Sequence, residues 1–422
     1  MSSSISSKPF SANGVAYAPR PVPSVAICLD GSSDEYLDAA MARGRMPVLS
    51  EFARSGYRGL ARAAMPTFTN VNNTSIVTGV PPSVHGIGGN FFYDTQAGRE
   101  VMMNSSSFVR AETIFAAARK AGRKVGVVTA KEKLRDIFAA GLISGESPGI
   151  AFSSEKADQA VPESHGIGGV EALVGHLKPA IYSGEASLYV LWAGAALLRH
   201  GLADLLYLST TDYMQHKYSP DQPEALDFYA RIDEAIGVLI SLGAVVAVTA
   251  DHGMNAKQRV DGTPNVVYLE TELEKRFGPG FRVILPITDP YVVHHGALGS
   301  FAVVHVPAHV DLTAVRGFLW GLGGVTEVHD REIAARLMEL PEDRLGELVV
   351  ASGRDAVLGR TPAYHDLSAL EGGLRSHGGR YEEMVPFLFS TPLKGPYLAR
   401  AAGDPRNFHI FDFLLNGTTA VG

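Results

Sequence analysis

The chain has 422 residues, of which 46% are hydrophobic and 19% charged, a balance typical of a soluble globular protein with a sizeable core. Its 37 basic and 44 acidic residues leave a net charge of −7, which argues against a protein that binds nucleic acid through phosphate contacts. The single cysteine, Cys28, excludes an intrachain disulfide, and no apolar run is long enough to span a bilayer. We therefore expect a cytoplasmic protein that binds neither nucleic acid nor a membrane.

The first part of the chain predicts alternating strands and helices. Residues 1–21 are rich in Ser and Pro, so we expect a flexible N-terminal arm. Short apolar runs then predict buried strands at 23–30, 124–130, 203–210 and 244–251, with helices at 46–56, 113–122 and 223–243. Strands that are apolar throughout and alternate with helices indicate an α/β fold whose mostly parallel central sheet is covered on both faces.

The pattern loosens after about residue 262 and predicts a second lobe. The following segment has strand-like runs at 281–287 and 300–306 and a helical pattern at 331–340. The chain becomes apolar enough to rejoin the core at 377–390. The predicted organisation is an arm (1–21), an α/β core (22–262 and 372–422) and an inserted α+β cap domain (263–371).

Acidic and imidazole side chains follow three of the four predicted strands. In doubly wound α/β folds, ligands bind at the carboxyl ends of the strands. The side chains expected at that edge are Asp30 after the first strand, Asp212 and His216 after the third, Asp251 and His252 after the fourth, and His377 in a glycine-rich SHGG turn. Carboxylates and imidazoles suit zinc or a similar divalent ion, and six ligands exceed one tetrahedral zinc. The pattern therefore predicts two metal ions.

Each of these motifs has a simpler interpretation when it is taken alone. Asp30 could be a helix cap, and the Asp212–His216 spacing occurs more often on a solvated helix face. The tripeptide Asp-His-Gly and the SHGG turn are weak signals. Their combination, in an order that one sheet edge could gather, favours the metal site.

A threonine hydroxyl is the candidate nucleophile. Thr69 is followed by Asn70, Asn72 and Asn73, which favour a turn that opens a helix. A hydroxyl at a helix N-terminus meets free backbone N–H groups that suit a phosphoryl oxygen. A zinc ion bound to this oxygen would lower the hydroxyl pKa. Without the metal pattern, Thr69 would be interpreted as a helix cap.

The glycine-rich segment 81–94 supplies a further candidate. Asn90 in this segment could donate an amide hydrogen bond to a phosphoryl oxygen in the transition state. A surface loop with Asn in a turn explains the same segment equally well.

The ordered set of motifs resembles the alkaline phosphatase superfamily. The matching residues are Asp30, 66–70 (PTFTN), 78–90, Asp212, His216, 251–253 (DHG) and 377–379 (HGG). Within it, the chain is similar to the branch with a threonine nucleophile, which includes the nucleotide pyrophosphatase/phosphodiesterases and the phosphonoacetate hydrolases. The set lacks the Ser and Arg of alkaline phosphatases and the Cys/Ser-x-Pro-x-Arg context of sulfatases. It also lacks the proline that usually follows the nucleophile of the pyrophosphatases.

The resemblance implies a role for each site residue. One zinc ion would be held by Asp212, His216 and His377, the other by Asp30, Asp251 and His252 with Thr69 as the reactive ligand, while Asn90 steadies the transferred group. The segment 129–135 (TAKEKLR) is similar to the phosphonoacetate hydrolases, where lysines of this kind bind the substrate carboxylate. That similarity assigns Lys131 and Lys133 to a small anionic substrate, although solvated lysines are the common case.

The expected function is hydrolysis of the C–P bond of phosphonoacetate to acetate and phosphate through a phosphothreonine intermediate. The alternative on the same core is a phosphodiesterase or nucleotide pyrophosphatase, with Phe91, Phe92 and Tyr93 as an aromatic clamp for a nucleobase. A metal-stabilised binding protein without catalysis is the third interpretation. His294 and His295 are expected to face solvent or to be structural, and a homodimer is compatible with the sequence.

Overall fold

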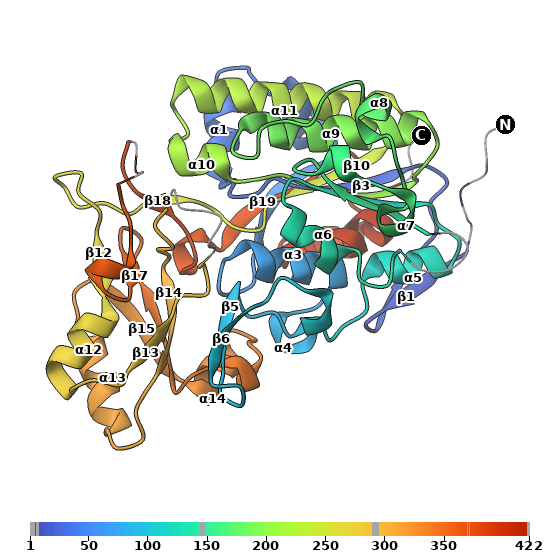
Figure 1. The fold of residues 1–422 in the computed structure, drawn as a ribbon. Helices are drawn as coiled ribbons and strands as arrows, with labels where there is room; N and C mark the ends of the chain where they lie inside the picture. Colours follow the sequence, from blue (N-terminus) through green and yellow to red (C-terminus); the bar gives the residue numbers. More distant parts are fainter. Residues whose placement is uncertain are drawn as a thin grey trace.

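A seven-stranded sheet forms the centre of the computed structural model, which describes residues 5, 8–143, 148–288, 295–368, 370 and 372–419 (Figure 1). In spatial order its strands are β4 (Tyr57–Arg62), β19 (Met384–Phe389), β10 (Val245–Thr249), β3 (Ser24–Cys28), β9 (Leu205–Ser209), β7 (Val125–Thr129) and β8 (Ile150–Ser153). The neighbours from β10 to β8 are parallel, whereas β19 is antiparallel to both β10 and β4. The mostly parallel α/β sheet predicted from the sequence is confirmed.

Helices cover both faces of this sheet, as Figure 1 shows. One face packs against α1 (Asp34–Ala42), α2 (Pro47–Ser55), α9 (Gly184–Arg199) and α11 (Pro223–Ser241); the other packs against α3 (Thr69–Thr78), α5 (Ile114–Lys120), α6 (Glu132–Phe138) and α16 (Ile410–Asp412). Alternate residues of β3 enter the two cores, with Val25 and Ile27 on one side and Ala26 and Cys28 on the other. This two-sided burial explains why the predicted strands are apolar throughout.

The helix predicted at 223–243 is confirmed as α11, with proline in its first turn. The helices predicted at 46–56 and 113–122 are α2 and α5, and the side chain of Thr113 caps α5 by accepting from the Ala116 N–H at 3.1 Å. Among the described residues, no helix combines the length and the apolar character needed to cross a membrane.

A second, antiparallel sheet lies beside the first, at the lower left of Figure 1. Its order is β13 (Arg282–Ile284), β14 (Phe301–His305), β16 (Leu348–Ser352) and β15 (Val325–Asp330), and it packs with α12 (Leu269–Phe277), α13 (Leu312–Trp320) and α14 (Arg331–Leu337). These elements fall within the predicted cap, whose exact boundaries stay a prediction. Phe68 and Val71 join the apolar core of this lobe, so the lobe packs directly behind the segment that carries Thr69.

Part of the predicted flexible arm is folded. β1 (Phe10–Ala12) and β2 (Val15–Tyr17) form an antiparallel hairpin. The rings of Phe10 and Tyr17 stack with centroids 5.0 Å apart, and both side chains are buried in the core that contains α5. The sequence prediction overlooked these residues because a hairpin this short has no extended apolar pattern, although two buried aromatic rings stabilise it.

Candidate active site

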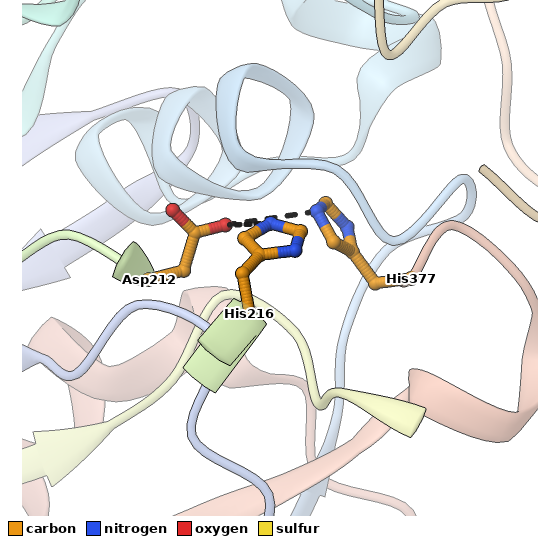
Figure 2. Close-up of side chains that lie close together, drawn as sticks. All are labelled: Asp212, His216 and His377. Atoms are coloured by element: carbon orange, nitrogen blue, oxygen red, sulfur yellow. Dashed lines mark hydrogen bonds and ion pairs between the residues drawn. The ribbon is translucent and has the colours of Figure 1, made fainter. Parts of the chain in front are cut away.

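Two segments from distant parts of the chain bring one carboxylate and two imidazoles together. Asp212 precedes the short helix α10 (Tyr213–Lys217), which carries His216 on its last turn. In Figure 2 His216 lies between Asp212 and His377, and dashed lines join the Asp212 carboxylate to both rings: its Oδ2 lies 3.1 Å from His216 Nε2 and 3.7 Å from His377 Nε2. The three side chains place their ligand atoms within 4.8 Å of one another, so they form one candidate metal site.

A second candidate site lies beside the first. Asp30, Asp212 and His252 also bring ligand atoms within 4.8 Å of one another, and Asp30 Oδ1 is 3.3 Å from His252 Nε2. Asp212 therefore belongs to both groups. Asp251, which the resemblance assigns here, has Oδ2 3.7 Å from His252 Nε2, and its oxygens also accept bonds from Gly31 N–H and the Asn73 amide.

Glycine at position 31 lets the two groups come together. Gly31 follows Asp30 and has φ +70°, a left-handed conformation that glycine adopts without strain. A Cβ atom at this position would lie 2.8 Å from Asp212 Cβ. The close approach of Asp30 to Asp212 thus depends on glycine here.

The three imidazoles are held in the orientation that metal ligands adopt. The Nδ1 atom of His252 lies 2.9 Å from the Gly253 carbonyl, that of His377 lies 2.7 Å from the Thr67 carbonyl, and that of His216 lies 2.8 Å from the Arg375 carbonyl. A carbonyl oxygen accepts only, so each ring donates its Nδ1–H to a carbonyl and turns Nε2 toward the carboxylates, where Nε2 can bind a metal ion once it carries no proton. The residues present therefore fit divalent metal ions.

Burial and neighbouring charges shift the pKa values of His377 and His252. Burial, followed by the nearby His252, lowers the pKa of His377 well below its ordinary value, which keeps that imidazole neutral. Burial also opposes the charged form of His252, but Asp251 and Asp30 outweigh it and raise the pKa of His252 to about 9. A neutral imidazole and ionised carboxylates are the forms that bind a metal, so a metal ion would displace the proton from His252.

Thr69 places its hydroxyl against this cluster. It is the first residue of α3, with Phe68 in extended conformation before it, and no side-chain cap bond forms at this end. Instead, Thr69 Oγ1 lies 3.2 Å from His252 Nε2, and only 8% of the residue is exposed. The interpretation of Thr69 as a mere helix cap therefore does not match its contacts.

Asn73, one turn further along α3, contacts Asp251 beside Thr69. Its amide donates to Asp251 Oδ2 at 3.0 Å, and its Oδ1 accepts from Tyr207 and Ser209 at 2.6 and 2.8 Å. The sequence suggested only a turn-forming role for this residue. Its spacing of four from Thr69 places both on one helix face and is the signal that could have revealed it.

Lys131 reaches the same acids. Its Nζ lies 2.8 Å from Asp30 Oδ2 and 2.9 Å from Asp212 Oδ1, so the ammonium bridges the two candidate sites. Burial alone would lower the pKa of Lys131, but the two carboxylates outweigh it and raise the pKa above its ordinary range. The structure thus places a positive charge among the candidate metal ligands.

The cluster opens into a cavity of about 460 Å³. The predicted residues that line it are Thr69, Asn90, Lys131, Lys133, Asp212, His216 and His377. Asn90 is 8% exposed, and its amide donates to the Ile287 carbonyl at 3.3 Å while its N–H donates to the Pro286 carbonyl at 2.6 Å. A Cβ on the preceding Gly89 would lie 2.3 Å from Pro286 Cβ, so glycine permits this contact with the second lobe.

The three aromatic residues expected to clamp a nucleobase lie away from the large cavity. Phe91, Phe92 and Tyr93 line a separate small cavity rather than the large one, so they do not form the expected clamp. The reason is that β5 (Phe91–Asp94) packs its side chains toward the second lobe, with Phe91 and Tyr93 in that lobe's core.

His295 was expected to face solvent or to be structural, and the structure excludes the solvent-facing position. It is 5% exposed, lines the large cavity and stacks on His216 with ring centroids 5.1 Å apart. His294 lies outside the described residues. The sequence held no signal for this contact, because it joins residues of two lobes.

The chain matches known proteins along most of its length. The family model of type I phosphodiesterase / nucleotide pyrophosphatase matches residues 24–173 and 187–378. The crystal structure of phosphonoacetate hydrolase from Sinorhizobium meliloti 1021 in complex with phosphonoacetate is 45% identical, with a TM-score of 0.92 over 98% of this chain and 100% of that chain. A complex of the same hydrolase with phosphonoformate matches equally well.

More distant relatives share the fold. Murine ectonucleotide pyrophosphatase / phosphodiesterase 5 has 17% identity and a TM-score of 0.61 over 95% of this chain and 96% of that chain. Ectonucleotide pyrophosphatase/phosphodiesterase family member 1 of Rattus norvegicus is 27% identical over 244 residues, 55% of this chain but 24% of that protein. The chain thus spans about a quarter of that relative's length. It belongs to the type I phosphodiesterase / nucleotide pyrophosphatase family of the alkaline phosphatase superfamily.

Proposed function

We propose that the chain hydrolyses the C–P bond of phosphonoacetate to acetate and phosphate through a phosphothreonine at Thr69. The observation that carries the proposal is a buried hydroxyl, 3.2 Å from an imidazole, at a cavity lined also by Lys131 and Lys133. A full-length relative at 45% identity, crystallised with phosphonoacetate, supports the same substrate.

We propose two zinc ions as the cofactor. Asp212, His216 and His377 would hold one ion, and Asp30, Asp251 and His252 would hold the other next to Thr69. Bound there, zinc supplies Lewis acidity that favours the ionised hydroxyl and offsets the charge on the phosphoryl oxygens. The Nδ1 contacts to backbone carbonyls support this assignment, because they leave each Nε2 available to a metal.

The chain's own residues carry the covalent chemistry. The Thr69 hydroxyl gives up its proton to water, its oxygen attacks phosphorus, the P–C bond breaks, and the electron pair of that bond moves onto the carbon beside the carboxylate. That carbon takes a proton to give acetate, and water then hydrolyses the phosphothreonine to phosphate and free Thr69. Asn90 donates its amide N–H to a phosphoryl oxygen as charge develops.

The lysines are proposed to stabilise the leaving group. Departing acetate carries charge on both the carbon and the carboxylate, so it needs cations at its side. Lys131 and Lys133 follow β7 and line the cavity, where their ammonium groups can bind the carboxylate as point charges. The contacts of Lys131 with Asp30 and Asp212 support a role for its ammonium group beside the proposed metal ligands.

Lys131→Ala and Lys133→Ala are each expected to lower kcat/KM for phosphonoacetate by about 10²-fold, equivalent to about 2.7 kcal/mol of transition-state stabilisation. The loss for 4-nitrophenyl phosphate is expected to be much smaller, since it has no carboxylate for an ammonium group to bind. Steady-state kinetics on both substrates test this. Lys124→Ala, with its ammonium on the Gly201 carbonyl, is the control. Equal losses on the two substrates would refute the carboxylate role.

A phosphodiesterase is the second candidate, and one observation favours it. Tyr182 and Tyr213 line the large cavity with ring centroids 6.4 Å apart, so aromatic faces are available there to an aryl or nucleobase group. Assays with bis(4-nitrophenyl) phosphate and phosphonoacetate at equal concentration discriminate the two functions. Faster cleavage of the diester would favour the phosphodiesterase.

The proposed partner is a small anionic molecule, which the cavity of about 460 Å³ can enclose. The cytoplasmic location and the homodimer that the sequence allows stay predictions. Light scattering of the purified chain measures the assembly.

A further inference from the structure

A fully buried ion pair lies behind the loops that carry two of the histidines. Lys257 follows β11 (Asn255–Ala256), and Glu382 ends a short 3-10 turn after the SHGG segment. Lys257 Nζ lies 2.8 Å from Glu382 Oε1, and neither side chain has any exposed surface. Neither residue lines the cavity, so the pair does not touch the proposed substrate.

Glu382 holds both histidine loops at once. Its Oε2 accepts the Gly379 N–H at 3.0 Å, two residues after His377. Its backbone carbonyl accepts the Gly253 N–H at 2.8 Å, one residue after His252. A single residue thus links the loops of the imidazoles that belong to the two candidate metal sites.

Lys257 extends this link to the second lobe. Its Nζ also donates to the Arg354 carbonyl at 2.7 Å, in the turn between β16 and β17 (Val357–Gly359). Asn255 completes the network: its amide donates to Glu382 Oε1 at 2.7 Å, and its Oδ1 accepts from Arg354 Nε at 3.0 Å. The two loops and the second lobe are therefore joined by charged and amide groups.

A short two-stranded sheet next to this network also links the two histidine loops. β11 pairs with β18 (Arg375–Ser376) in antiparallel fashion, with Asn255 opposite Ser376. β11 follows the Asp251–Gly253 segment and β18 directly precedes His377. The two histidine loops are therefore linked twice, by the β11–β18 pairing and by the hydrogen bonds of Glu382.

Stability alone does not account for a charged pair here. Burial lowers the pKa of Lys257, which reflects the cost of removing its charge from water. A well-packed apolar pair in such a place is often as stable as a buried ion pair or more so. A charged pair differs from an apolar pair because it makes directed hydrogen bonds. The Glu382 carboxylate accepts hydrogen bonds from three separate donors.

We propose that the Lys257–Glu382 pair is a positioning device that sets the separation of His252 and His377 and thereby the affinity of the metal pair. The inference rests on the proposed metal sites and extends the machinery to two residues that touch neither metal nor substrate. Outer-shell partners of metal ligands typically contribute 10–100-fold to metal affinity.

Glu382→Gln tests the proposal. The two carboxylate oxygens of Glu382 both accept hydrogen bonds, whereas the amide of glutamine has only one accepting oxygen. In either orientation its NH₂ group faces a donor, which is the Gly379 N–H or the Lys257 and Asn255 groups. Titration of the metal-free full-length chain with Zn²⁺ is expected to show affinity lowered by about 10–100-fold. The Co²⁺ absorption spectrum is expected to change as well, because the ligand geometry shifts.

Asp204→Asn is the matched control for loss of a buried ion pair. Asp204 pairs with buried Arg123 at the opposite end of β9 from Asp212. This variant is expected to lower Tm yet bind Zn²⁺ as the wild type does. Equal weakening of Zn²⁺ binding in Asp204→Asn and Glu382→Gln would overturn the positioning role.

The double variant Lys257→Met/Glu382→Leu removes both charges without leaving one unpaired. Its Zn²⁺ affinity is expected to stay low, and wild-type affinity in it would overturn the inference. If the wild-type chain binds two Zn²⁺ ions and Glu382→Gln binds them with the same affinity, the positioning role is overturned and the proposed metal sites stand. A wild-type chain that binds no Zn²⁺ overturns the proposed metal sites as well.

Discussion

Thr69→Ala is expected to lower the turnover of phosphonoacetate by roughly 10³-fold or more while the chain still binds its metal ions. The hydroxyl is the proposed attacking group, and it lies 3.2 Å from His252 rather than in a helix-capping bond. His252 keeps a second contact without this hydroxyl, because its Nδ1 lies 2.9 Å from the Gly253 carbonyl. Single-turnover kinetics and metal analysis of the purified variant measure both quantities.

Two companions sharpen the Thr69 experiment. Thr69→Ser keeps a hydroxyl and is expected to retain part of the activity. Thr78→Ala removes a buried hydroxyl from the far end of α3, where it donates to the Thr74 carbonyl, and is expected to retain near wild-type turnover. A Thr69→Ala variant with near wild-type rate would show that the nucleophile lies elsewhere.

Asp212→Asn is expected to disturb both metal positions. Its carboxylate belongs to both groups of ligand atoms, contacts His216 and Lys131, and is almost fully buried. Replacement by a neutral amide of similar shape removes the negative charge that a cation needs there. We expect fewer than two bound zinc ions and a loss of turnover of roughly 10²-fold or more. Substitution of residues that only contact a metal ligand already lowers metal affinity by about 10–100-fold.

Asp233→Asn serves as the control for Asp212→Asn. Asp233 is also buried, but its carboxylate accepts the N–H groups of Val48 and Leu49 at the start of α2. It is expected to change stability and leave zinc content unchanged. Full zinc content and wild-type turnover in Asp212→Asn would contradict the shared role of Asp212.

The sheet was predictable because its strands are buried on both faces. Strands β3, β7, β9 and β10 are buried at every position and mostly apolar, and their order with the helices indicates parallel pairing. The β1–β2 hairpin was missed, since its two aromatic anchors leave no periodic signal.

Convergence of the acids and imidazoles was also predictable. Asp30, Asp212 and Asp251 each follow a parallel strand, and the carboxyl ends of parallel strands meet at one edge. Composition and position in the chain therefore suffice to predict that these side chains converge, and the metal ions themselves stay a prediction.

The supporting groups were not predictable in the same way. Glu382 acts through backbone groups of loops on either side of it in space, and Gly253 lies more than a hundred residues away in the chain. His295 reaches His216 from the second lobe, and Phe91 turns away from the cavity. Such contacts depend on how loops and lobes distant in the chain pack together, which periodicity and motif spacing do not encode.

Parallel measurement of phosphate and acetate released from phosphonoacetate tests the central claim most directly. The account predicts release in equal amounts by the purified chain, loss of both after treatment with a chelator, and return of both on addition of Zn²⁺. Absence of both products from the zinc-loaded chain, or release that a chelator leaves unchanged, would contradict it.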